Sequence, residues 1–155
     1  MMVLAIRPDS WNFPLLLHVG GAMLLVASIT VAIVAFAQSW RESDPDSAAQ
    51  LFRFGALTMF FAALPAFIVM RGAAQWIASK EHLENSNVSW IGIGFATSDF
   101  GGLILLLTLI LTGIALRRSR RGAGLGKLAK VGSALPLLLL ALYVIAIWAM
   151  TTKPS

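Results

Sequence analysis

Residues 15–37 read LLLHVGGAMLLVASITVAIVAFA and contain no charged side chain. The segment has 23 residues, and about 20 predominantly apolar residues are enough to span the hydrocarbon core of a bilayer as an α-helix. A signal peptide would have a shorter apolar core, of about 7–15 residues, behind a more basic leader. Here the leader holds only Arg7, offset by Asp9. We therefore interpret residues 15–37 as a transmembrane helix.

Three further apolar segments follow, and they predict helices at about 46–78, 90–116 and 131–150. Asp44 and Pro45 favour a helix start, with Asp44 as the N-cap and Pro45 at the first helical position. Pro65 is expected to kink the second helix. Every connection between the segments is short. The sequence therefore predicts an all-α integral membrane four-helix bundle of up-down-up-down topology, built as a single domain over residues 1–155.

The composition agrees with a membrane chain. Hydrophobic residues make up 58% and charged residues 12% of the sequence, whereas about a quarter of a soluble domain is charged. The chain has no cysteine, which excludes disulfides, thiolate metal sites and covalently attached haem. The loops are too short to hold a soluble domain. Any function must therefore lie within the bundle, on its lipid-facing surface or at contacts with another protein.

The basic residues predict the orientation of the chain. Six of the 12 Lys and Arg residues lie between the third and fourth predicted helices: Arg117, Arg118, Arg120, Arg121, Lys127 and Lys130. Short cytoplasmic loops carry an excess of Lys and Arg, so we expect this loop inside and both termini outside, in the plasma (inner) membrane. That orientation places eight basic residues inside and four outside. The same six residues are candidates for contact with anionic lipid headgroups. A basic patch this local does not indicate nucleic-acid binding.

Two charged residues interrupt the apolar segments at matched depth. Arg71 lies 18 residues after Arg53, and Asp99 lies 18 residues before Arg117. Each is therefore about 27 Å from the inner charged boundary, close to the outer edge of the membrane core. We predict an Arg71–Asp99 ion pair, with Gln75 on the same helix face as Arg71. The alternative is that Arg71 extends to the headgroups, while residues 97–99 cap a third helix whose residues 90–96 lie along the interface.

His18 is the only histidine inside an apolar segment. It lies 20 residues before Gln38, which places it at the level of Arg71 and Asp99. Its imidazole is a candidate haem ligand, and Asp99 is the candidate acceptor that would orient the ring. The alternative is a hydrogen-bonded interfacial histidine. His82 is the only other histidine. It lies in the outer loop between the second and third predicted helices and could reach His18, although nothing in the spacing requires it.

The segment Leu17-His18-Val19-Gly20-Gly21-Ala22-Met23 resembles a feature of small bacterial four-helix membrane proteins. These are the copper-resistance protein D-like proteins and the membrane protoporphyrinogen oxidase family, and in the latter a histidine of the first helix is thought to ligate haem. The resemblance implies a four-helix membrane fold and a b-type haem with His18 as axial ligand. The second and third helices resemble those of uncharacterised bacterial integral membrane proteins, which implies the fold alone.

The sequence contains no acid–base pair at the bilayer midplane, no nucleophile beside a base and no dense set of metal ligands. We therefore expect a non-enzymatic accessory or assembly component of the inner membrane, with no catalytic residue and no metal. Its partners would be the lipid bilayer and either another membrane protein or a second copy of the chain. One alternative is a b-type haem-binding redox protein using His18. Another is a small-solute or lipid carrier whose site is the outer polar cluster of His18, Arg71, Gln75 and Asp99.

Overall fold

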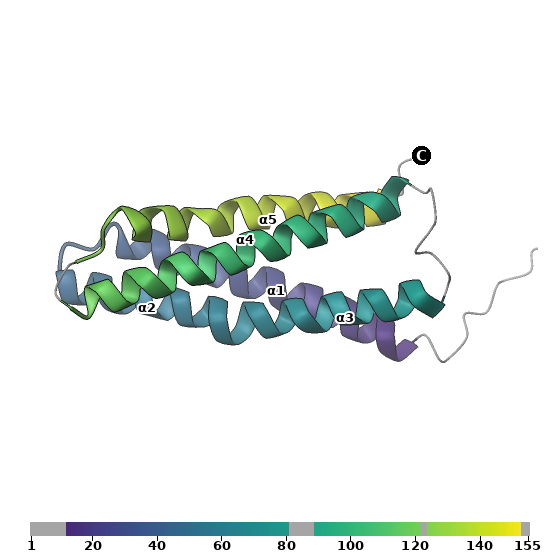
Figure 1. Cartoon of the computed structure of the whole chain (residues 1–155), viewed down its shortest axis with the longest axis horizontal. Helices are drawn as coiled ribbons and strands as arrows, with labels where there is room; N and C mark the ends of the chain where they lie inside the picture. Colours follow the sequence, from purple (N-terminus) through teal and green to yellow (C-terminus); the bar gives the residue numbers. More distant parts are fainter. Residues whose placement is uncertain (1–11, 81–88, 122–123, 153–155) are drawn as a thin grey trace, which may run out of the picture.

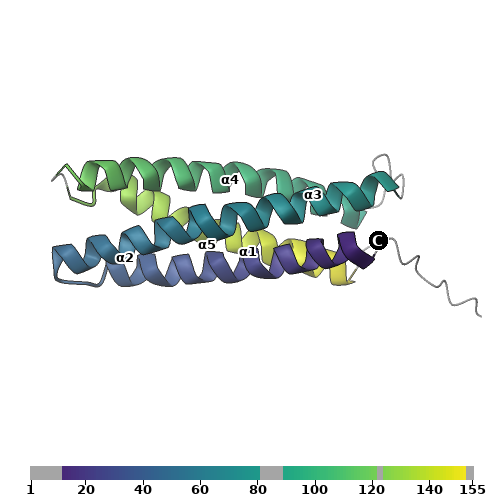
Figure 2. The same cartoon turned by 90° about the horizontal axis from the view of Figure 1, so that it is seen from below.

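The computed structural model describes residues 12–80, 89–121 and 124–152, which are helical apart from short turns. In chain order the elements are α1 (Asn12–Ser39), α2 (Pro45–Thr58), the π-helical segment η2 (Met59–Ala63), α3 (Leu64–Lys80), α4 (Ser89–Ser119) and α5 (Lys127–Thr152). Because α2, η2 and α3 are continuous, these residues form four long helical rods that run antiparallel (Figures 1 and 2). Each predicted span lies inside one rod, and the rods extend beyond the predicted spans at both ends.

The outer surface of the bundle is apolar. Within the described residues, four helical spans are long and apolar enough to cross a membrane: 12–39, 45–80, 92–119 and 127–152. Outward-facing side chains such as Met23 and Phe61, each 70% exposed, continue this apolar character around the bundle. Soluble proteins rarely expose so much apolar surface, whereas lipid chains would cover it. The fold is thus an all-helical bundle suited to a multi-pass membrane protein.

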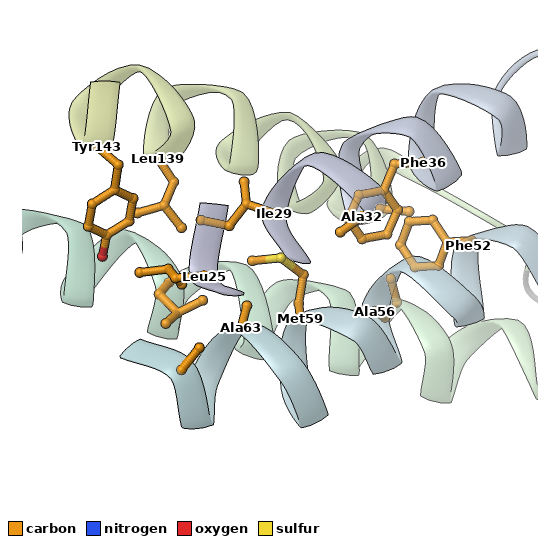
Figure 3. Close-up of a cluster of buried hydrophobic side chains, with 14 of the residues drawn as sticks. Leu25, Ile29, Ala32, Phe36, Phe52, Ala56, Met59, Ala63, Leu139 and Tyr143 are labelled. Carbon is orange, nitrogen blue, oxygen red and sulfur yellow. The ribbon is translucent and has the colours of Figure 1, made fainter. Parts of the chain in front are cut away.

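Helix α1 is the central packing element, because it contacts α2, α3 and α5. Its inward positions alternate at spacings of four and three residues, as expected for helices that pack nearly antiparallel. These positions are Pro14, His18, Gly21, Leu25, Ser28, Ala32, Ala35 and Ser39. Figure 3 shows Leu25 and Ile29 of α1 meeting Met59 of η2 and Leu139 of α5 in the core. His18 therefore lies on the face of α1 that packs against the rest of the bundle.

The π-helical segment η2 lies just before Pro65, where a kink is predicted. In this segment the Leu64 amide donates to the Met59 carbonyl, five residues earlier. A π-turn contains one more residue than an α-turn, so Met59 and Ala63, four residues apart and both fully buried, keep to the same face. Pro65 has no amide hydrogen to donate. The structure thus accommodates Pro65 beside a widened turn.

The four rods do not pack equally tightly. Helix α4 packs closely along α5, but it makes few direct contacts with α3. The buried positions of α4 are small or hydroxylated for most of its length, with Gly94, Gly101, Thr108, Thr112 and Ala115 facing inward. Small residues allow two membrane helices to approach closely. The seam between α3 and α4, in contrast, is held mainly by side chains that reach across it.

The turns α1–α2 and α4–α5 lie at the same end of the bundle (Figure 1). There Asp44 is the N-cap of α2, as predicted: its Oδ2 accepts from the Ser47 amide at 2.8 Å, and Pro45 follows. The hydrogen bonds from Ser47 hold the pKa of the Asp44 carboxyl below its usual value. At the same end of the bundle, Trp40 Nε1 donates to Ser133 Oγ at 3.0 Å and links the end of α1 to α5.

Candidate functional site

The predicted polar cluster is distributed over three helices. His18 comes from α1, Arg71 and Gln75 from α3, and Asp99 from α4. Arg71 Nη2 lies 3.1 Å from Asp99 Oδ1, and Arg71 Nη1 donates to Gln75 Oε1 at 3.0 Å. The ion pair expected from matched depth is thus present, with Gln75 joined to it.

The ion pair lies on the perimeter of the bundle. The side chain of Arg71 is 27% exposed and that of Asp99 is 64% exposed. The Arg71 guanidinium also lies over the Phe95 ring, 5.1 Å from its centroid, in the arrangement of a cation–π contact. Arg71 therefore bridges α3 and α4 where the two helices otherwise barely touch.

Residues 97–99 do not cap a helix, so the alternative in which they begin the third transmembrane helix is wrong. Helix α4 runs without interruption from Ser89 to Ser119. The Thr97 hydroxyl donates to the carbonyl of Ile93 at 2.7 Å, within the helix. A hydroxyl that bonds to the preceding turn leaves the helix intact, which explains how Thr97 is accommodated inside α4.

His18 does not join the ion pair. Its Nδ1 lies 3.1 Å from the backbone carbonyl of Met70, on α3. A carbonyl can only accept, so Nδ1 is the donor in this contact. The expectation that Asp99 orients the His18 ring is therefore wrong, because the Met70 carbonyl takes that place. His82, the histidine predicted to be within reach, lies outside the described residues.

The contact between His18 and Met70 depends on the close approach of α1 and α3. Gly21, one turn after His18, has no room for a side chain: a Cβ there would lie 2.9 Å from the Met70 backbone nitrogen. A Cβ placed on neighbouring Gly20, in contrast, would meet no atom within 4 Å. Gly21 thus brings the backbone of α3 within hydrogen-bonding distance of His18.

From the sequence, Ser98 was considered only as part of the helix cap 97–99, and Tyr143 was not considered. Ser98 Oγ and Tyr143 Oη are buried and have no hydrogen-bond partner within the described residues. Tyr143, on α5, is only 5% exposed, and its hydroxyl faces Gly101 of α4. The available signal was that Tyr143 is the only tyrosine of the chain and lies inside an apolar segment of 20 residues.

The six basic residues predicted to contact anionic lipid lie around the α4–α5 turn and are exposed. Arg117 and Arg118 are in the last turn of α4, where cations interact favourably with the helix dipole. Lys127 and Lys130 are at the start of α5, where the dipole disfavours them, so helix stability does not explain their presence. Lys130 Nζ lies 5.6 Å from the centroid of the Trp40 ring.

The described residues contain no group of three or more His, Cys, Asp or Glu side chains that could hold a metal ion. Within the described residues His18 is the one histidine, and its Nε2 is the candidate haem ligand because Nδ1 contacts the Met70 carbonyl. Comparison of the chain with protein-family models, with curated proteins and with solved structures found no match.

Proposed function

We propose that this chain is a non-enzymatic accessory or assembly component of a bacterial inner membrane. In this role it binds the transmembrane helix of another membrane protein along the α3–α4 seam. The basic α4–α5 turn faces the cytoplasm, and both termini lie on the opposite side. The observation that carries the proposal is the Arg71–Asp99 pair, which lies on the bundle perimeter rather than in its interior.

Charged side chains within a membrane span normally face the interior of a bundle or a partner. Asp99 is instead 64% exposed, and its contact with Arg71 is made through Oδ1. Exposed Phe100 and Leu103 flank it on α4. A partner helix with a hydrogen-bond donor at this level would cover the carboxylate and bury the flanking apolar surface. Such interhelical hydrogen bonds contribute about 0.6–2 kcal/mol in membranes.

The surface of α4 next to Asp99 supports a close helix approach. Gly92 and Ala96 are exposed, and they precede Asp99 by seven and three residues. Positions separated by three, four or seven residues share one helix face. No atom lies within 4 Å of a Cβ placed at Gly92. The small residues Gly92 and Ala96 thus lie on the face that carries the Asp99 carboxylate, where a partner helix could approach closely.

Site-specific photo-crosslinking in cells tests this proposal. A photoreactive residue at Leu103, four residues after Asp99 and 65% exposed, should crosslink to one defined membrane protein. The matched control is Leu137 on α5, 56% exposed, which should give no such product. Asp99→Asn should weaken the Leu103 crosslink. Equal crosslinking at both positions, or a Leu103 product insensitive to Asp99→Asn, would overturn the proposal. A crosslinked second copy of the chain would identify the partner as the protein itself.

Haem binding is a second candidate function, favoured by the hydrogen bond between His18 and Met70. Histidines that ligate a metal usually donate their other ring N–H to a carbonyl or carboxylate, which fixes the tautomer. The His18 Nδ1 contact with the Met70 carbonyl, at 3.1 Å, is of this type. His18 would hold the iron through Nε2, and haem would supply one-electron redox chemistry.

Protein produced with added haem should then show a Soret band that is lost in His18→Ala. Because Asp99 pairs with Arg71 and not with His18, Asp99→Asn should leave that band unchanged. This outcome separates haem binding from the accessory role, which depends on Asp99. Colourless wild-type protein after haem supplementation would eliminate the haem candidate.

A further inference from the structure

The exposed basic side chains around the α4–α5 turn form a patch of uncompensated positive charge. This basic patch consists of Arg117, Arg118, Arg120, Arg121, Lys127 and Lys130. Within the described residues, none of the six makes an ion pair with an acidic side chain. The neighbouring α1–α2 turn, at the same end of the bundle (Figure 1), does not neutralise them. There Glu42 Oε1 accepts from the Ser43 and Asp44 amides at 3.0 and 3.2 Å, and Asp44 Oδ2 caps α2.

Trp40, at the end of α1, lies beside the basic patch in a defined position. Its Nε1 donates to Ser133 Oγ at 3.0 Å, and Ser133 Oγ donates to the Lys130 carbonyl at 3.1 Å. The Lys130 ammonium lies 5.6 Å from the centroid of the Trp40 ring. Trp40 is 37% exposed, and tryptophans of membrane proteins are enriched at the level of the lipid headgroups. The contact therefore holds Lys130 beside a residue type that favours that level.

Exposed apolar side chains continue from the basic patch along both helices that carry it. Ile114 precedes Arg118 by four residues on α4, and Val131 follows Lys127 by four residues on α5. Residues four apart share one helix face. Ile114 is 39% exposed and Val131 is 53% exposed. Cationic groups thus lie next to apolar surface along each helix, which matches a ligand with an anionic head and apolar chains.

We propose that the basic patch, together with Trp40, binds an anionic phospholipid. The lipid phosphate contacts the guanidinium and ammonium groups, which form strong charge-assisted hydrogen bonds with phosphate oxygens. The acyl chains lie on the exposed apolar side chains beside Arg118 and Lys127. Clusters of Lys and Arg next to a transmembrane helix attract anionic lipids in this way. The site is independent of the accessory role, because it does not involve Asp99.

The orientation signal carried by these residues is a separate property, since it needs only their charge while the chain enters the membrane. Lipid binding is a property of the folded protein and can be measured after purification. Native mass spectrometry of the protein, released from detergent with phosphatidylglycerol and phosphatidylcholine added in equal amounts, reports which lipid stays bound. We expect preferential retention of phosphatidylglycerol. Equal retention of the two lipids, or release of phosphatidylglycerol by millimolar inorganic phosphate, would overturn the proposal.

Lysine variants show whether the basic patch is responsible. Lys130→Gln should weaken phosphatidylglycerol binding about fivefold, the effect of one cation near the membrane surface, whereas Lys130→Arg should retain it. Lys80→Gln is the matched control, because Lys80 Nζ also lies 5.6 Å from the centroid of a tryptophan ring, that of Trp76, but outside the basic patch. It should leave binding unchanged. Equal effects of Lys130→Gln and Lys80→Gln would overturn the proposal.

Fluorescence quenching in a bilayer locates the bound lipid without changing the basic patch. Of the five tryptophans, a variant keeps Trp40 and has Phe at the other positions. In phosphatidylcholine vesicles, brominated phosphatidylglycerol should quench Trp40 more strongly than the same mole fraction of brominated phosphatidylcholine. Equal quenching by the two brominated lipids would show that no anionic lipid gathers beside Trp40 and would overturn the proposal.

Discussion

Arg71 Nη2 and Asp99 Oδ1 lie 3.1 Å apart and join α3 to α4 across the least tightly packed side of the bundle. The two residues are 28 positions apart in the chain and reach the same level because α3 runs away from the end of the bundle that holds the α4–α5 turn and α4 runs toward it. The pair is part-exposed, so we expect it to contribute about 1 kcal/mol or less to stability. Its structural importance comes from its position, since few other contacts hold α3 to α4.

A double-mutant cycle should reveal this link. Arg71→Gln and Asp99→Asn should each lower the free energy of unfolding in a lipid bilayer or mild detergent. The double variant should recover about 0.2–1 kcal/mol of the summed loss, the range measured for part-exposed pairs. Lys80→Gln, at the end of α3, is the control for loss of a positive charge. Additive effects of the two single substitutions would show that the contact does not stabilise the bundle.

Adjacent glycines on α1 should respond in opposite directions to alanine. In Gly21→Ala the new Cβ would lie 2.9 Å from the Met70 backbone nitrogen, so α1 and α3 must separate. We expect a loss of about 1–3 kcal/mol in unfolding free energy, as for other overpacked sites. Gly20→Ala meets no atom within 4 Å and should gain up to about 1 kcal/mol from helix propensity. Similar stabilities for the two variants would contradict the close approach of α1 and α3.

Cysteine accessibility should establish the orientation, because the chain has no native cysteine. Ser43, in the α1–α2 turn, and Ser79, near the end of α3, are both exposed at opposite ends of the bundle. In intact cells, a membrane-impermeant thiol reagent should label Ser79→Cys and not Ser43→Cys. Both should be labelled after the membrane is permeabilised. The reverse pattern in intact cells would place the basic turn outside, against the charge bias.

Because Asp44 caps α2, the folding stability of the protein should depend on pH. The pKa of the Asp44 carboxyl is lowered in the folded protein by hydrogen bonds from Ser47. The stabilisation is therefore fully present above the unfolded value of 3.8, and it is lost as the pH falls through the lower folded value. Asp44→Asn keeps an acceptor but removes the titration. We expect the difference in thermal midpoint between wild type and Asp44→Asn to shrink below about pH 4. A difference that is constant with pH would contradict this role of the carboxylate.

Several features of the chain follow from local chemistry and were predictable from the sequence. The four apolar segments, the Asp44–Pro45 helix start and the equal depths of Arg71 and Asp99 all depend on short-range properties. Helix rise per residue is nearly constant, so distance along a helix converts to depth without knowledge of the neighbours. Gln75 was placed beside Arg71 by the same reasoning, since residues four apart share a face.

The tertiary structure alone decided which side of each helix meets which neighbour. In a water-soluble bundle an apolar stripe marks the buried face, but here outward-facing Phe61 is as apolar as inward-facing Leu25. The sequence therefore did not indicate that Tyr143 and Ser98 point inward, or that α3 passes close enough for the Met70 carbonyl to accept from His18. Asp99 was predicted to orient the His18 ring because both residues lie at the same depth in the membrane. Equal depth does not show in which direction a side chain points around its helix axis. That direction is determined by close packing at positions such as Gly21 and Gly101, where the absence of a side chain lets one helix rest against another.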